Sequence, residues 1–157
     1  MTEAGDALFD LVETIALDPE EGMPLLDYHL ARLKRSADVL DFTFDRHSVR
    51  NELQAATFRL RVKSRVRLLA SRRGSVAIEV RPHISWPQPI MQVAIVKRPV
   101  SSSDWRLHHK TTERDIYRDA LHSGGTYEVL MVDDEGYLTE GSFTNIFVER
   151  GDKLVTP

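Results

Sequence analysis

The sequence predicts an α+β fold divided into two domains, and three observations support this prediction. Helical and strand periodicities alternate along the N-terminal part of the 157-residue chain. A stretch rich in proline and serine then interrupts both patterns, and a second set of helical and strand patterns follows it. We therefore expect a small domain at residues 1–98, a linker at residues 99–105 and a second domain at residues 106–157.

The first domain is expected to begin with a strand and two helices. The strand covers Leu8–Leu17, because this run is mostly apolar and a loop at residues 18–22 ends it. We assign Asp27 as the N-cap of the first helix and Asp45 as the N-cap of the second. Apolar residues in the first helix recur at spacings of three and four, at Leu30, Leu33, Ala37 and Leu40.

A β-hairpin and a buried strand are expected next. Residues 59–67 alternate between charged and apolar side chains, so at least the second half of this run is expected to be a half-buried strand. Arg73-Gly74 supplies a turn, and the alternation resumes over residues 76–80. The run Ile90–Val96 is almost continuously apolar, which predicts a strand buried on both faces.

The second domain is expected to contain one short helix and several strands. Thr112 is assigned as the cap of the helix, which ends at Gly124-Gly125. Strands are predicted at residues 127–132 and 145–148, with a turn at residues 133–136 after the first.

The composition excludes several classes of protein. There is no cysteine, so disulfides, thiol catalysis and thiolate metal sites are excluded. A formal net charge of −3 does not favour general binding to nucleic acid. No apolar run approaches the roughly 18 residues of a membrane span, and the histidines lack the spacing of a metal site. We expect a cytoplasmic protein that binds neither nucleic acid nor membrane and holds no metal.

Short motifs at both ends of the chain indicate a more specific assignment. The segment Glu140-Gly-Ser-Phe-Thr-Asn145-Ile-Phe precedes Leu154-Val-Thr-Pro157, and a lone Lys110 lies 30 residues before Glu140. Near the N-terminus, Glu13-Thr-Ile precedes His29-Leu-Ala-Arg32-Leu. These motifs resemble fold type IV pyridoxal-phosphate enzymes, the family of branched-chain aminotransferases, D-amino acid aminotransferases and 4-amino-4-deoxychorismate lyases. The resemblance implies the two-domain fold of that family.

The resemblance also gives roles to four residues. Lys110 would bind the cofactor covalently and move a proton at the substrate α-carbon, although a lysine alone is usually a solvated surface residue with a pKa of about 10.4. Arg32 would bind the cofactor phosphate, a task suited to a planar cation with several donors. Glu140 would hold the protonated ring nitrogen, and Asn145 would support the cofactor-binding loop.

A fifth residue favours one branch of this family. Arg114 follows Lys110 by four residues, which is similar to the lyase branch, whereas the branched-chain aminotransferases carry a Gly-Gly-Asn-Tyr run there. Thr111, Thr112 and Tyr117 also resemble lyase domains fused to aminodeoxychorismate synthases. Arg114 would bind a carboxylate of the substrate.

The resemblance therefore implies a homodimeric 4-amino-4-deoxychorismate lyase of folate biosynthesis that releases pyruvate and 4-aminobenzoate. One alternative is a branched-chain or D-amino acid aminotransferase of the same fold. Another is a non-catalytic binding module that uses the basic strand at residues 59–67. In the family, further chain after the motif completes the phosphate site. Because this sequence ends at Pro157, we expect the second domain to be incomplete and the chain alone to be a poor enzyme.

Overall fold

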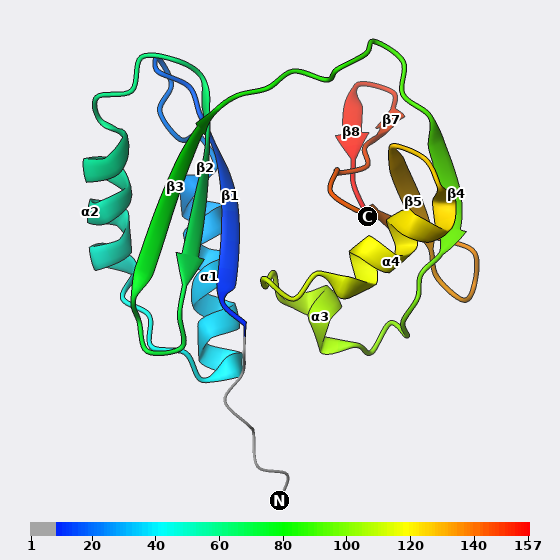
Figure 1. Cartoon of the computed structure of the whole chain (residues 1–157), viewed down its shortest axis with the longest axis horizontal. Coiled ribbons are helices and arrows are strands. Elements are labelled where there is room, and N and C mark those ends of the chain that lie inside the picture. The colour runs from blue at the N-terminus through cyan, green and yellow to red at the C-terminus, as the bar shows by residue number, and fades with distance from the viewer. Residues whose placement is uncertain (1–8) are drawn as a thin grey trace, which may run out of the picture. The chain divides into compact units, whose positions relative to one another are not determined.

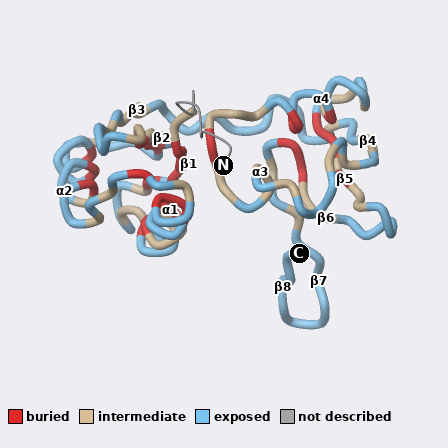
Figure 2. The backbone as a smooth tube through the Cα atoms, turned by 90° about the horizontal axis from the view of Figure 1, so that it is seen from below, coloured by how far each residue is buried: buried red, intermediate tan, exposed pale blue. Residues whose placement is uncertain are grey.

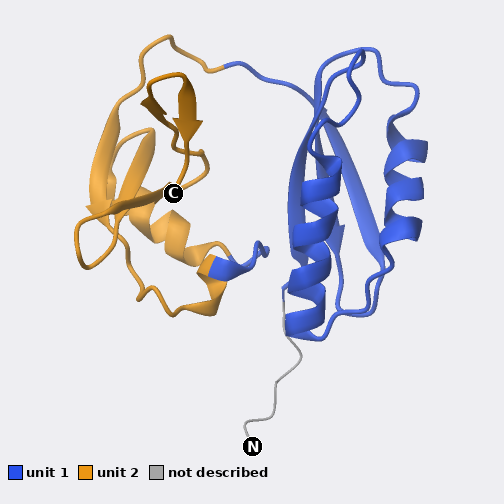
Figure 3. Ribbon diagram, turned by 180° about the vertical axis from the view of Figure 1, so that it is seen from behind, with its two compact units in different colours: residues 1–85, 108–113 blue, residues 86–107, 114–157 orange. Residues whose placement is uncertain are grey.

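The computed structural model describes residues 9–157, and the chain forms two compact units (Figure 3). Unit 1 contains the chain up to Ser85 together with His108–Glu113. Unit 2 contains Trp86–Leu107 and Arg114–Pro157. The expected linker at residues 99–105 lies inside unit 2, because the strand before it pairs with a strand of the same unit.

Unit 1 is a three-stranded antiparallel sheet with two helices on one face (Figure 1). Its elements are β1 (Leu11–Leu17), α1 (Leu26–Leu40), α2 (Arg46–Thr57), β2 (Ser64–Ala70) and β3 (Val76–Pro82). The strands lie in the order β1-β2-β3. Alternate residues of β1 and β2 face the helices, and Figure 2 marks them as buried. The core is formed by Leu11, Ile15, Leu30, Leu33, Leu53, Val66 and Leu68.

The first strand, both helices and the hairpin of unit 1 are confirmed, but one helix cap was wrong. Leu8, the first residue of the predicted strand, lies outside the described residues. Asp45 caps α2, since its side chain accepts hydrogen bonds from the backbone N–H groups of His47 and Ser48. The N-cap of α1 is Leu25 and makes no side-chain cap bond. Asp27 lies within α1 and accepts hydrogen bonds from two arginines of α2 instead.

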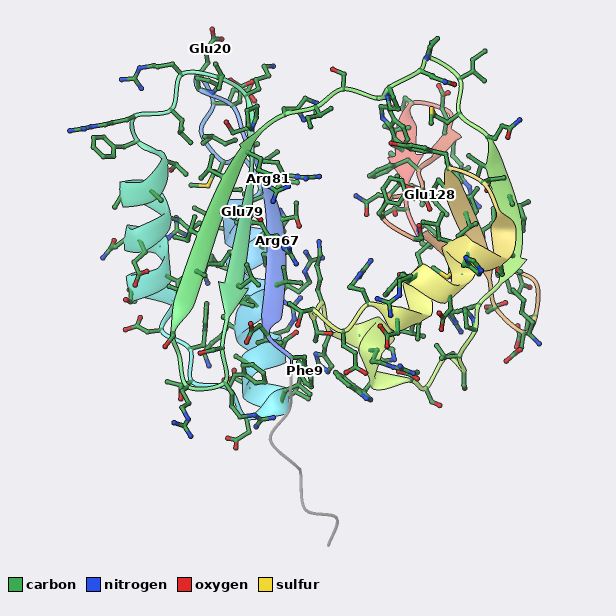
Figure 4. All side chains as sticks on the ribbon, in the orientation of Figure 1. Phe9, Glu20, Arg67, Glu79, Arg81 and Glu128 are labelled. Carbon is green, nitrogen blue, oxygen red and sulfur yellow. The ribbon has the colours of Figure 1, made fainter. Side chains whose placement is uncertain are left out.

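The basic strand predicted at residues 59–67 is a strand only from Ser64 onwards. Arg65 and Arg67 are exposed on the face of the sheet that the helices leave open. Arg67 lies opposite Glu79 in the register of β2 and β3, and Glu79 also pairs with Arg81 (Figure 4). A carboxylate thus partly offsets the positive charge of this face.

Unit 2 is built on a mixed three-stranded sheet packed against one helix. Its strands are β4 (Val93–Lys97), β5 (Glu128–Val132) and β6 (Leu138–Gly141), with β4 parallel to β5 and β5 antiparallel to β6. The helix α4 (Asp115–Gly124) packs on β4 and β5, and a short helix α3 (Trp105–His108) precedes it. A hairpin of β7 (Val148–Arg150) and β8 (Lys153–Val155) follows. The core consists of Ile116, Tyr117, Ala120, Val129 and Met131.

Three expectations for unit 2 were wrong. The strand predicted at residues 145–148 begins only at Val148, the first residue of β7. The strand β4 is not buried on both faces: Ala94 and Val96 pack on the core, whereas Ile95 on the opposite face is 67% exposed. Thr112 does not cap α4, whose N-cap is Arg114. The side chain of Thr112 accepts a hydrogen bond from the backbone of Asp10 in unit 1 instead.

Within residues 9–157, no helix combines the length and the apolarity that crossing a membrane requires.

Candidate functional site

The segment that carries Lys110 runs along the outer edge of β1. The N–H of Val12 donates to the carbonyl oxygen of Lys110 at 2.9 Å, and the N–H of Thr112 donates to that of Asp10 at 2.9 Å. Leu11 and Thr111 lie opposite each other between these two bonds. The backbone of Lys110 is therefore held beside an isolated β-bridge, which covers part of an edge that would otherwise be unpaired.

The same segment is also tied to α1. The Nδ1 atom of His109 lies 3.0 Å from the hydroxyl of Ser36, which is buried in α1. Burial, together with the neighbouring His108, lowers the pKa of His109. A neutral imidazole at this contact costs less to desolvate than a charged one.

A buried carboxylate lies between β1 and α1. The side chain of Glu13 is 1% exposed, and its Oε1 atom accepts a hydrogen bond from Nε of Arg32 at 2.7 Å. Its Oε2 atom is bound by Nη2 of Arg32 and lies 2.8 Å from Nδ1 of His29. Because His29 and Arg32 are three residues apart on the helix, both side chains point to the same face and reach one acceptor.

Electrostatics connects this carboxylate with Lys110. Burial alone would raise the pKa of Glu13, but hydrogen bonds from Arg32 and His29 and the positive charges of Arg32 and Lys110 hold it below its usual value. The bond to Glu13 in turn raises the pKa of Arg32. Unit 1 therefore brings the guanidinium of Arg32 and the ammonium of Lys110 into the electrostatic range of one ionised carboxylate.

A second group of polar residues lies in unit 2. Glu140 is half-buried near the end of β6, and its Oε2 atom accepts a hydrogen bond from the hydroxyl of Tyr117 at 3.0 Å. The guanidinium of Arg114 lies 3.6 Å from the centre of the Tyr117 ring, and its Nη2 atom donates to the carbonyl oxygen of Ser142 at 2.8 Å. These contacts join the start of α4 to the end of β6.

The turn after β6 is held from the other side by Glu128, labelled in Figure 4. This carboxylate belongs to a residue that is 2% exposed, and it accepts hydrogen bonds from hydroxyl and backbone N–H groups. Ser142 donates through both groups, Thr144 through its hydroxyl at 2.6 Å, and Phe143 and Val129 through their N–H groups. Burial raises the pKa of Glu128, but these donors outweigh it and hold the pKa below the usual value.

A glycine permits this arrangement. A Cβ atom at Gly141 would lie 2.4 Å from the hydroxyl oxygen of Thr144 and 3.1 Å from Oε2 of Glu128. Any other residue would push apart the hydroxyl and the carboxylate that it binds. The Glu140-Gly141 pair in the sequence motif is thus explained by the close approach of the turn to Glu128.

Asn145 follows the turn that Glu128 holds. Its side chain is exposed and makes no hydrogen bond within residues 9–157. Asn145 lines an open pocket of about 540 Å³ together with Trp86 and Met91. Beside this pocket, the rings of Trp86, Tyr127 and Phe143 contact one another.

The predicted site residues are divided between the two units. Unit 1 contains Arg32 and Lys110, and unit 2 contains Arg114, Glu140 and Asn145. Sequence reasoning assigned no role to Glu13 or Glu128 and used Tyr117 only as a mark of resemblance. A signal for both carboxylates was present, because each is an acidic residue within an otherwise apolar strand pattern, where an ionisable group needs partners.

Comparison with known proteins identifies relatives along almost all of the chain. A model of the family described as "Amino-transferase class IV" matches residues 10–157. A Schizosaccharomyces pombe protein named "Putative aminodeoxychorismate lyase" is 27% identical over 155 residues, which cover 94% of this chain and 66% of that protein.

Solved structures share the fold. The crystal structure of a "Putative amino-acid aminotransferase" from Mesorhizobium loti superposes with a TM-score of 0.80 at 30% identity, over 95% of this chain and 74% of that one. A "Putative 4-amino-4-deoxychorismate lyase" gives a TM-score of 0.72 at 25% identity, over 92% and 62%. This chain thus spans about two thirds of the length of these relatives.

Proposed function

Because this chain belongs to the class IV aminotransferase family, we propose that it carries cofactor-binding residues of a 4-amino-4-deoxychorismate lyase. The family depends on pyridoxal phosphate. The proposed reaction eliminates pyruvate from the amino substrate and leaves 4-aminobenzoate, a step of folate biosynthesis. The lyase name of the Schizosaccharomyces pombe relative and the lyase-like spacing of Lys110 and Arg114 support this choice over other reactions of the family.

One observation carries the assignment of the cofactor. Glu13 binds Nε and Nη2 of Arg32 and leaves Nη1 without a hydrogen-bond partner within residues 9–157. The result is a guanidinium with one edge fixed and one edge available for an anion, next to a lysine whose charge reaches the same carboxylate. The residues of unit 1 therefore fit a ligand that carries both a phosphate and an aldehyde, with Arg32 for the phosphate and Lys110 for the aldehyde carbon.

The remaining roles concern the chemistry at the substrate. When bound, the cofactor accepts the electron pair that the substrate α-carbon keeps after losing its proton. Lys110, once released by the substrate amine, would take that proton and return it. Glu140 would hold the ring nitrogen in its protonated form, Asn145 would support the cofactor-binding loop, and Arg114 would bind a substrate carboxylate.

A transaminase is the second candidate. The observation that favours it is the 30% identity to the Mesorhizobium loti protein named as an amino-acid aminotransferase. In this case the same lysine would return the proton to the cofactor side, and a keto acid would leave. A binding module that uses the basic face of β2 is the candidate from another class, supported by the exposed Arg65 and Arg67.

Trapping the cofactor tests the proposal and separates an enzyme from a binding module. We expect borohydride reduction of the chain with pyridoxal phosphate to place a pyridoxyl group on Lys110, as read by peptide mapping. Reduction also traps a weakly held cofactor, and Lys153→Ala, an exposed position in β8, is the matched control. Labelling at Lys97 or Lys153, or no labelling, contradicts the proposal.

Product analysis separates the two reactions. In the natural protein that contains this sequence, a lyase releases pyruvate and 4-aminobenzoate from aminodeoxychorismate without an amino acceptor. A requirement for a keto acid acceptor would show a transaminase instead.

Assembly and location belong to the same proposal. We expect a homodimer in the cytoplasm, which is the state that the resemblance implies and which the absence of cysteine permits. Sedimentation of the natural protein with bound cofactor would test the dimer.

A further inference from the structure

The hydroxyl of Tyr117 is buried against a carboxylate of the proposed site. Tyr117 lies in α4 and is 7% exposed, and its hydroxyl donates to Oε2 of Glu140 at 3.0 Å. Packing α4 on the sheet needs only the ring. A phenol oxygen buried at this position instead needs a partner, and Glu140 is that partner.

Both ends of this hydrogen bond are fixed by neighbours. The ring of Tyr117 lies under the guanidinium of Arg114, 3.6 Å from it, and Arg114 is itself bound to the carbonyl oxygen of Ser142. On the other side, Glu128 holds Ser142 and the following turn. The hydroxyl that binds Glu140 and the turn that follows Glu140 are therefore both held by contacts from α4 and β5.

The protonation state of Tyr117 lets its hydroxyl donate to Glu140. Burial, the negative charge of Glu140 and the bond to it raise the pKa of Tyr117 to about 12. At neutral pH the hydroxyl thus keeps its proton and donates it to the carboxylate. This bond occupies Oε2, whereas Oε1 of Glu140 has no hydrogen-bond partner within residues 9–157.

We propose that Tyr117 is a positioning residue that holds the Glu140 carboxylate through Oε2 so that Oε1 is directed to the ring nitrogen of the cofactor. This inference rests on the proposed function, because it assigns the free oxygen to that ligand. If this is right, the chain should bind a ligand with a ring nitrogen more tightly than one without it, and this difference in affinity should depend on the hydroxyl of Tyr117. A role in packing alone would affect every ligand to the same extent.

The experiment compares two probes by equilibrium binding: pyridoxal phosphate and its analogue with C–H in place of the ring nitrogen. The parent chain should bind pyridoxal phosphate more tightly than the analogue. Tyr117→Phe keeps the ring and its contact with Arg114, and it should lower this preference by about tenfold while the affinity for the analogue changes less than about twofold. Tyr137→Phe, an exposed tyrosine of unit 2, is the matched control and should leave both affinities unchanged.

The outcomes separate this inference from the function on which it rests. Equal weakening of both probes by Tyr117→Phe would show that the hydroxyl is structural and overturn the inference alone. If the parent bound both probes equally well, or bound neither, Glu140 would not contact the ring nitrogen. Both this inference and the proposed function would then be contradicted.

A second measurement uses the parent chain, so it tests the inference even if the Tyr117→Phe variant folds poorly. In protein labelled with ¹³C at tyrosine Cζ, pyridoxal phosphate should shift the resonance of Tyr117 because it shares Glu140 with that ligand. The analogue should leave the resonance in place. A resonance that pyridoxal phosphate does not move would overturn the inference.

Discussion

Glu13 and Glu128 show two ways in which a carboxylate stays ionised inside this protein. Glu13 is paired with the guanidinium of Arg32, whereas Glu128 is surrounded by neutral donors from the turn after β6. In both cases burial raises the pKa, but hydrogen bonds, joined at Glu13 by the charges of Arg32 and Lys110, leave it below its usual value. Both residues act on their neighbours by fixing donors in place.

The first prediction concerns stability and pH. Glu13→Gln removes the charge that holds Arg32, and we expect a loss of about 2 kcal/mol in the free energy of unfolding at pH 7. Because the pKa of Glu13 lies below its ordinary value of 4.5, its contribution is complete above that pH and is lost as the pH falls through the lowered pKa.

Urea unfolding of the parent and of Glu13→Gln between pH 7 and pH 3 measures this effect. The difference between them should shrink below pH 4.5, since protonated glutamate resembles glutamine. Asp38→Asn removes an exposed partner of Lys34 and serves as the control, with an expected change below about 0.5 kcal/mol. A difference that stays constant over this range would contradict the prediction.

The second prediction concerns Glu128. In Glu128→Gln an amide NH₂ group replaces one acceptor and faces backbone N–H groups that cannot turn away, so we expect a loss of about 2 kcal/mol or more. Amide hydrogen exchange should speed up at Ser142 and Phe143 in particular. Glu149→Gln, at an exposed position of β7, is the control. Unchanged exchange at the turn would refute the role of Glu128.

Individual contacts mark the limit of what the sequence predicts. Motif spacing gave proposed roles to Arg32, Lys110 and Glu140, because a resemblance can be read from residue types at fixed separations in the chain. The partners of Glu13 lie 16 and 19 residues away, and the partners of Glu128 in the turn lie 14 to 16 residues away, so these contacts depend on how strands and helices pack. A sequence pattern shows that a buried acidic residue needs partners but does not identify them.

At the scale of elements, the two helices of unit 1 allow a direct test of capping. Asp45→Ala should cost about 1 kcal/mol of stability, because two N–H groups of α2 lose their acceptor. Asp27→Ala should cost less, since Asp27 lies inside α1 and makes only exposed ion pairs. Urea unfolding of both variants measures the difference, and equal losses would show that Asp45 does not act as a cap.

Whether a segment forms a helix or a strand was easier to predict from the sequence than which of its faces are buried. Alternation along β2 and β3 and three-to-four spacing along α1 follow from burial of one face, so these elements were predicted correctly. Continuous apolar character at Ile90–Val96 predicted burial on both faces, yet only one face of β4 is covered by α4. The sequence of a strand shows which of its faces are apolar, whereas the elements that cover those faces are determined by the rest of the fold.

The exposed face of β4 leads to a prediction for the whole molecule. Val93 and Ile95 are 48% and 67% exposed on a strand at the edge of its sheet, which favours association between chains. We expect the 157-residue chain to self-associate and Ile95→Thr to lower its mean mass in light scattering. Ile84→Thr, at an 82% exposed loop position, is the control and should change little. A monodisperse parent chain would contradict this expectation.

The path of the chain limits how this molecule can be divided. Residues 108–113 belong to unit 1, where they pair with the edge of β1, although the stretches before and after them in the sequence belong to unit 2. No single cut in the chain therefore yields both units intact. A fragment that ends at Ser85 lacks the strip that carries Lys110, and a fragment that starts at Trp86 carries that strip without the strand it pairs with. Each unit has its own core, yet neither can be produced complete as one continuous stretch of the sequence. The segment of unit 1 that interrupts unit 2 contains Lys110, the lysine proposed for catalysis.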